Sequence, residues 1–127
     1  MAKSNYLENK VLDHFLGTSS TSAPSNVYVG LFTSNPTDAG SGTEVSGSGY
    51  TRKVASFSSA SSGSTSNSSA IEFTASGGAF GTVTHFGVFD ASTSGNLLYH
   101  GALTASKTIA DTDTLKISAS GLTITET

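Results

Sequence analysis

The 127-residue chain has no cysteine, no tryptophan, one methionine and two prolines. The absence of cysteine excludes a disulfide framework and a thiolate metal site. Only 12% of the residues are charged, the formal net charge is −3, and the six lysines and arginines are dispersed along the chain. Sequence-independent nucleic-acid binding needs clustered cations that displace counterions from phosphates, so we expect no nucleic-acid partner.

Long apolar runs are also missing. No run approaches the roughly 18–20 residues of a membrane-spanning helix, so we expect no membrane partner. The apolar residues of 6–16 are interrupted by charged and polar residues, which is not the pattern of a signal-peptide core. The length fits one modest hydrophobic core, and we expect residues 1–127 to form a single β-sandwich domain.

Hydroxyl residues are abundant in place of charges. The chain contains 24 serines and 18 threonines, a third of all residues. A hydroxyl-rich surface with few charges repels its neighbours less than an ordinary charged surface does. This composition favours a protein that lives in an assembly, and it carries no information on catalysis.

The rest of the chain can be arranged around the stretch 82–103, TVTHFGVFDASTSGNLLYHGAL. Two apolar runs, 83–89 and 97–103, flank a polar loop in which Gly95 is the natural left-handed position. This pattern predicts a β-hairpin. Apolar residues occupy both faces of the first run, so we expect a central hairpin whose two faces are both covered.

Several other short apolar or alternating runs are bounded by glycine, serine and aspartate turns. They are 27–33, 50–57, 71–73, 104–109, 115–118 and 122–125. This pattern predicts a mainly β fold, an antiparallel β-sandwich (jelly-roll or Ig-like) with one N-terminal α-helix. The low-complexity segment 58–69 is expected to be a flexible Ser-rich loop or arm. Gly30, Gly87 and Gly101 interrupt strands beside aromatic or histidine residues, which indicates close approach of a ring.

Residues 4–17 form the predicted helix, with Ser4 as N-cap and Gly17 as the left-handed stop. Its apolar stripe has the width of a face that packs on protein. We favour packing on its own domain, with docking on a neighbouring subunit as the alternative. The candidate assembly-interface residues of this stripe are Leu7, Val11, Leu12, Phe15 and Leu16.

No residue pattern predicts catalysis. His85 and His100 lie on the two arms of the hairpin near Asp90, but no recognised metal-ligand spacing is present, so we interpret them as structural. Asp111 and Asp113 lack the EF-hand spacing and are interpreted as a turn. Nucleophile-elbow and phosphate-loop motifs are absent from the sequence. We therefore expect no enzyme, no catalytic residues, no metal and no cofactor.

Seven separated motifs together resemble a family of small tailed-phage virion proteins usually labelled phage tail fibre proteins. They are NYLENKVLD (5–13), VYVGLFT (27–33), PTDAG (36–40), GTEVS (42–46), GYTR (49–52), GTVTHFGVFD (81–90) and GNLL (95–98). The resemblance implies a virion structural protein that contacts other phage virion proteins of the tail or capsid and forms a homo-oligomer, such as a trimer. One departure is Thr112, where the family resemblance implies a glycine turn.

Three functions are compatible with this resemblance. We favour a tail-fibre-like, tail-associated module that assembles through protein–protein contacts. The alternative is a capsid decoration (cement) protein that stabilises the phage head. A third hypothesis is a host-glycan-binding module that recognises a surface receptor, with Tyr28, Tyr50 or Tyr99 as stacking platforms.

Overall fold

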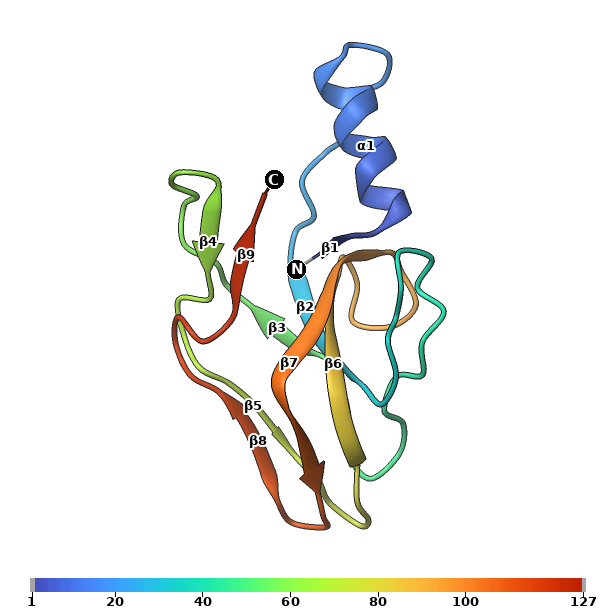
Figure 1. The fold of residues 1–127 in the computed structure, drawn as a ribbon, viewed down its shortest axis with the longest axis vertical. Coiled ribbons are helices and arrows are strands. Elements are labelled where there is room, and N and C mark those ends of the chain that lie inside the picture. The colour runs from blue at the N-terminus through green and yellow to red at the C-terminus, as the bar shows by residue number, and fades with distance from the viewer. Residues whose placement is uncertain (1, 127) are drawn as a thin grey trace.

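A five-stranded antiparallel sheet forms one layer of the protein, whose computed structural model describes residues 2–126 (Figure 1). Its strands, in spatial order, are β1 (Ala2–Lys3), β7 (Leu97–Ile109), β6 (Gly81–Phe89), β2 (Val27–Phe32) and β3 (Lys53–Ala55). The other strands form two antiparallel ribbons, β4 (Ser64–Ser66) with β9 (Thr123–Thr125) and β5 (Ile71–Thr74) with β8 (Thr114–Ile117). Within residues 2–126 there is one helix, α1 (Asn5–Phe15). The predicted mainly β, antiparallel, sandwich-like class with an N-terminal helix is confirmed.

The predicted hairpin lies in the large sheet, with β6 between β7 and β2. The second arm is longer than predicted, because β7 runs without interruption to Ile109 and includes the run 104–109. These residues find partners in the early part of β6, where Gly81 pairs with Ile109 and Val83 with Lys107. A register shift between Val83 and His85 joins the two paired regions.

The main core lies between the large sheet and the two ribbons. β5 shows how sequence alternation sets this packing, since Ile71 and Phe73 are buried while Glu72 and Thr74 are exposed. The core residues come from both layers: Val29, Leu31, Val45, Ala55, Ile71, Phe73, Ala75, Phe80, Val83, Phe86, Val88, Ile109, Leu115, Leu122 and Ile124.

The other face of the large sheet carries a second, smaller cluster of Phe32, Phe89 and Leu97. The rings of Phe32 and Phe89 stack with centroids 5.9 Å apart. A Cβ atom at Gly87 would lie 2.8 Å from Leu97 and 3.0 Å from each of these rings, so glycine is required there. Both faces of the hairpin are thus covered, and ring approach at Gly87 is confirmed.

The Ser-rich segment 58–69 differs from the expected loop or arm, because Ser64–Ser66 pairs with the last strand as β4. Asn67, which is fully buried, holds the end of this strand. Its side-chain Nδ2 donates to the carbonyls of Ser69 and Ser118, both at 2.9 Å, and its Oδ1 accepts from the Leu122 amide at 2.9 Å. The segment 58–69 has no apolar periodicity of its own. It is held in place by the backbone pairing of β4 with β9 and by the hydrogen bonds of the buried Asn67 side chain.

A turn at 110–113 joins β7 to β8, as the two aspartates predicted. Asp113 Oδ2 accepts from the Ala110 amide at 3.1 Å, and Asp111 Oδ1 accepts from the Gly77 amide at 3.1 Å. Thr112 has φ of +70°, so a β-branched residue occupies the left-handed region here. The backbone therefore has the conformation of a glycine turn although the residue is threonine.

Replacing Thr112 by glycine is expected to stabilise the protein by about 0.5–1 kcal/mol. The left-handed conformation costs an L-residue about 1–2 kcal/mol, and the greater freedom of glycine in the unfolded chain offsets part of that gain. Urea unfolding measures the difference. The matched control is Thr104→Gly within β7, which should destabilise; a loss of stability in both variants would contradict the interpretation.

Candidate assembly interface

The start of α1 is fixed to the beginning of β7. Ser4 is buried, and its amide donates to the Leu98 carbonyl at 2.8 Å. The Ser4 hydroxyl donates to the Leu97 carbonyl and accepts from the Leu7 amide at 3.2 Å, as an N-cap does. The Asn5 amide donates to the Asp38 carbonyl at 2.9 Å. The predicted N-cap is confirmed, and the same residue also anchors the helix to the sheet.

The end of α1 is closed locally. The Leu16 amide donates to the Leu12 carbonyl at 2.9 Å, and Gly17 has φ of +85°, which is the predicted left-handed stop. The Thr21 amide then donates to His14 Nδ1 at 3.1 Å as the chain returns toward β2. These contacts stabilise the helix end through its own connector and not through the β layers.

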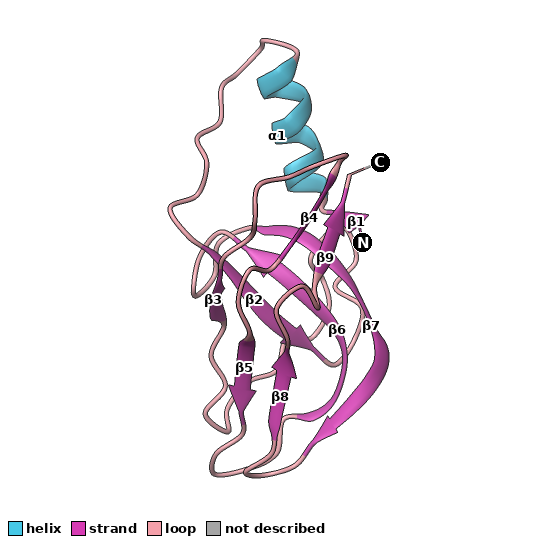
Figure 2. Cartoon of the chain, turned by 90° about the vertical axis from the view of Figure 1, so that its left-hand side faces the viewer, coloured by secondary structure: helices cyan, strands magenta, loops and turns pink. Residues whose placement is uncertain are grey.

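No residue of α1 is buried, although its stripe is apolar. Leu7 and Val11 are half-buried, while Leu12, Phe15 and Leu16 keep 55%, 77% and 74% of their surface exposed. The favoured interpretation, packing on its own domain, is wrong for this end of the helix. The helix meets the sheet near its start and then extends past the end of the strands (Figure 2).

We call the exposed residues Leu12, Phe15 and Leu16 the α1 tip. Among the described residues the large hydrophobic side chains that remain exposed are these three and Val54. Contiguous exposed apolar patches are typical of surfaces that bind another protein, a membrane or a ligand. The structure thus brings three of the five predicted interface residues together at one end of the helix.

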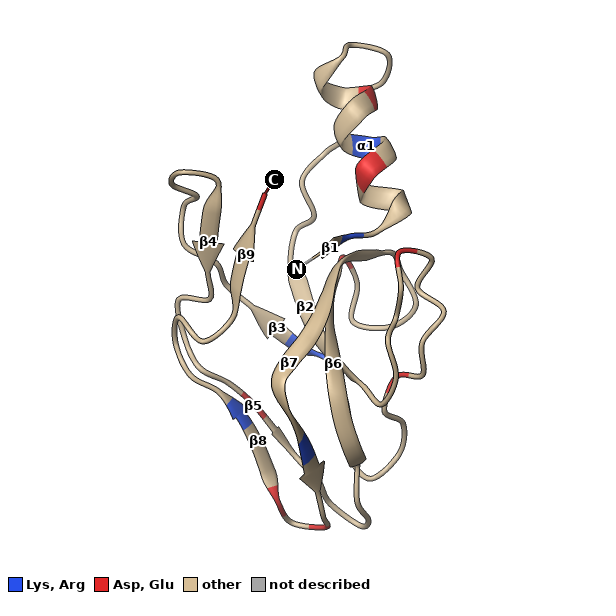
Figure 3. Cartoon of the chain, viewed as in Figure 1, with Lys and Arg blue, Asp and Glu red and all other residues tan. Residues whose placement is uncertain are grey.

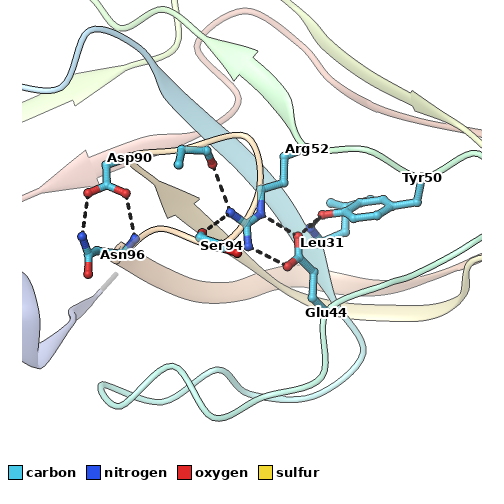
Figure 4. A network of polar contacts seen from close by, with 8 residues as sticks. Leu31, Glu44, Tyr50, Arg52, Asp90, Ser94 and Asn96 are labelled. Atoms are coloured by element: carbon cyan, nitrogen blue, oxygen red, sulfur yellow. Dashed lines mark hydrogen bonds and ion pairs between the residues drawn. The ribbon is translucent and has the colours of Figure 1, made fainter.

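A polar network around Arg52 covers the outer face of the sheet (Figure 4). Its Nε and Nη2 donate to the two carboxylate oxygens of Glu44, both at 2.9 Å, in a bidentate pair. Its Nη1 donates to the carbonyls of Ala91 and Ser94 at 3.0 and 2.7 Å. The guanidinium also lies 3.5 Å from the centre of the Phe89 ring. One side chain therefore ties two loops to the sheet.

Tyr50 belongs to the same network. Its hydroxyl donates to Glu44 Oε2 at 2.6 Å and accepts from the Leu31 amide at 3.0 Å. Its ring stacks on Phe73 and meets Phe80 edge-on. Burial, followed by the hydrogen bond to Glu44, raises the pKa of the Tyr50 phenol far above its ordinary value. Tyr50 is therefore a packing residue and not an open stacking platform.

The other two tyrosines proposed for glycan stacking, Tyr28 and Tyr99, lie on opposite faces of the large sheet. Tyr28 pairs with Phe89, whereas Tyr99 pairs with Val88, and neighbouring positions along a strand face opposite ways. The Tyr99 hydroxyl donates to Glu126. The three tyrosines proposed for glycan stacking are not brought together in one site.

The predicted structural histidines have separate partners. His100 pairs with Gly87 and His85 with Ala102, so the two histidines are not directly opposite each other in the hairpin. His100 Nε2 lies 2.8 Å from Asp38 Oδ1, beside the helix anchor. Asp90 accepts from the Asn96 amide at 2.7 Å and from its side chain at 2.9 Å. Within residues 2–126 no group of three His, Cys, Asp or Glu residues is placed to hold a metal ion.

Sequence reasoning missed the pairing of Glu44 with Arg52. A signal for it exists at Gly30, where an added Cβ would lie 2.8 Å from Glu44 Oε2 and 2.9 Å from the Tyr50 hydroxyl. The sequence predicts ring approach at Gly30, and the added Cβ would also lie 3.2 Å from the Phe89 ring. The partly buried Glu44 carboxylate beside Gly30 comes from a loop whose position the strand pattern does not specify.

The polar side chains described above mainly form hydrogen bonds that hold the loops of the same chain, and the exposed apolar surface is the α1 tip. These features are typical of a β-rich structural subunit. Comparison with family models adds the identity: the chain belongs to the family described as "Podophage GP4 fiber I protein gp80", whose model matches residues 2–125. It is therefore a bacteriophage virion structural protein of a fibre family.

Two other findings accompany this match. A search of the curated proteins gives no match to the chain. In the part of the chain that the structure describes, no helix is both long and apolar enough to span a membrane.

Replacing Arg52 by methionine is expected to lower the free energy of unfolding by about 3 kcal/mol. The change leaves the Glu44 carboxylate without its bidentate partner in a site that is largely closed to solvent. Urea unfolding measures the loss. The matched double variant Glu44→Gln/Arg52→Met removes both charges and should be less destabilised than the single variant; equal losses would contradict the role of the ion pair.

Stability is expected to fall as the pH rises above about 10, because an unfolded tyrosine ionises near that value. Tyr50 keeps its proton in the folded state, because its pKa is raised. Its contribution to the free energy of unfolding is therefore fully present below about pH 10 and is lost as the pH rises above that value. Tyr50→Phe should flatten the decline of the free energy of unfolding between about pH 9 and about pH 11. Tyr99, whose pKa is also raised, contributes to the slope that remains in this variant. Identical declines in wild type and Tyr50→Phe would show that the phenol ionises equally in both states.

Proposed function

We propose that the protein is a non-enzymatic, tail-associated module of the virion that assembles through protein–protein contacts. The family match over residues 2–125 supports a fibre role. The absence of sequence motifs for catalysis agrees with a role in binding and building. On this proposal residues 1–127 act as one folded unit, and other virion proteins are its partners.

The observation that carries the proposal is the exposure of the α1 tip. Phe15 and Leu16 each keep about three quarters of their surface in solvent. Full burial of such a side chain contributes about 1.5–3 kcal/mol. A single contact of this size is modest, but repetition in a symmetric particle converts modest contacts into strong attachment through avidity.

The hydroxyl-rich, weakly charged surface supports a capsid decoration role equally well, and this remains the second candidate. Immunogold labelling of intact particles separates the two, since a fibre module is labelled at the tail and a decoration protein over the head. Host-glycan binding has less support, because Tyr50 is engaged in packing and Tyr28 and Tyr99 face opposite ways.

Phe15→Asp is expected to leave the β layers folded and to abolish incorporation into the virion. The side chain is 77% exposed, so the substitution leaves the core intact but places a charge on the α1 tip. Circular dichroism and thermal unfolding test the fold, and the protein content of purified particles tests incorporation.

The matched control for this substitution is Asn9→Asp, which adds the same charge to an exposed position about 120° around the helix from Phe15. It should be incorporated normally. Normal occupancy of the Phe15→Asp variant would refute the α1 tip as an assembly contact.

A further inference from the structure

We propose that the α1 tip of one copy of this chain occupies an apolar groove on a second copy. The groove lies between the inner face of the large sheet and the β4–β9 ribbon, and we call it the β9 groove. The residues of its walls that matter here are Val27, Phe57, Ala60, Val88, Leu98 and Ile124. This inference rests on the proposed function and names the partner of the same contact.

The β9 groove suits an apolar side chain. Its volume is about 250 Å³. A dry protein cavity of about 150 Å³ takes up benzene, so the groove has room for the ring of Phe15. The polar groups at its edge already have partners, because Glu126 accepts from Lys3 Nζ at 2.7 Å and from the Tyr99 hydroxyl. An apolar group can enter without leaving these atoms unpaired.

The helix cannot fill the groove of its own copy. Ser4, just before α1, donates to the carbonyl of Leu98, which is a wall residue of the groove. A helix rises 1.5 Å per residue, so the α1 tip lies about 12–18 Å along the axis from this anchor. Figures 1 and 2 both show α1 extending away from the strands. The tip and the groove can therefore meet only between two molecules.

A second copy is the occupant that satisfies both surfaces. Every chain carries one uncovered tip and one open groove, so a head-to-tail contact uses each once and closes into a ring where the rotation permits. A different protein in the groove would leave every α1 tip still in need of a partner. The sequence from 54 to 71 and from 117 to 125 contains no charged residue, so docking against β4 and β9 desolvates few charges (Figure 3).

Disulfide trapping tests the contact directly, because the natural chain has no cysteine. Two single variants, Phe15→Cys and Ala60→Cys, are mixed under mild oxidation and analysed by non-reducing electrophoresis and mass spectrometry. We expect a disulfide between the two different chains, formed at least about tenfold faster than in the control, because docking raises the effective concentration of the thiols. The control pair is Asn9→Cys with Ala60→Cys. Its helix cysteine lies nearer the start of α1 and about 120° around the helix from Phe15.

Complementation supplies the second readout, measured as mass in analytical ultracentrifugation. Ala60→Trp blocks the groove at an exposed position, and Phe15→Asp disables the tip. Each variant alone should lose the wild-type oligomer, while Ala60→Ser should retain it. An equal mixture should form a two-chain complex, since one intact tip and one intact groove remain.

Three outcomes overturn the inference. Equal trapping in the Asn9→Cys control would show random collision. Retention of the full oligomer by Ala60→Trp, with loss in Phe15→Asp, would show that the tip docks outside the β9 groove. A monomeric wild type would exclude a second copy as the partner. In that last case the proposed function still stands or falls separately on virion incorporation of Phe15→Asp.

Discussion

The contacts of the Arg52 guanidinium with Glu44 and with the loop between β6 and β7 are the interaction on which the placement of α1 depends. The guanidinium holds the carbonyls of Ala91 and Ser94, and so fixes the loop between β6 and β7 against the outer face of the sheet. The pairing of Asp90 with Asn96 closes the same loop. The next two residues present the carbonyls that receive Ser4, so the direction in which α1 leaves the sheet follows from this chain of contacts.

This arrangement needs the glycines of the two central strands. The outer face must accept a bidentate ion pair and two stacked rings within one layer, and a Cβ at Gly30 or Gly87 would lie within 3.0 Å of that layer. Glycine weakens a strand interior, because it packs no side chain and gains freedom on unfolding. The loss is compensated by a covered second face, which gives the sheet a core on both sides.

The sequence predicts best where local chemistry decides. Alternation predicts a strand at 71–73, where β5 spans Ile71–Thr74, the caps predict α1, and two aspartates predict the turn before Thr114. Prediction from the sequence fails where a strand forms only because a segment distant in the sequence pairs with it. Ser64–Ser66 became a strand only because β9 lies beside it, and the predicted strand 50–57 is reduced to Lys53–Ala55. Glu44 comes from a loop, so no periodicity indicates that it reaches Arg52. The stripe of α1 was predicted as a packing face, but sequence periodicity does not say which molecule it packs against.

An exposed apolar helix end is a liability for an isolated protein and an advantage for a subunit. The β layers of this chain are complete without α1, since their core contains no residue of the helix. The core of the β layers therefore does not use the apolar side chains of the α1 tip, which stay exposed. A surface rich in serine and threonine suits a protein that lives in an assembly, because a neutral hydroxyl costs less to desolvate than a charged group and can form hydrogen bonds with a neighbour. The buried core and the exposed apolar surface thus lie in different parts of one short chain, joined at Ser4.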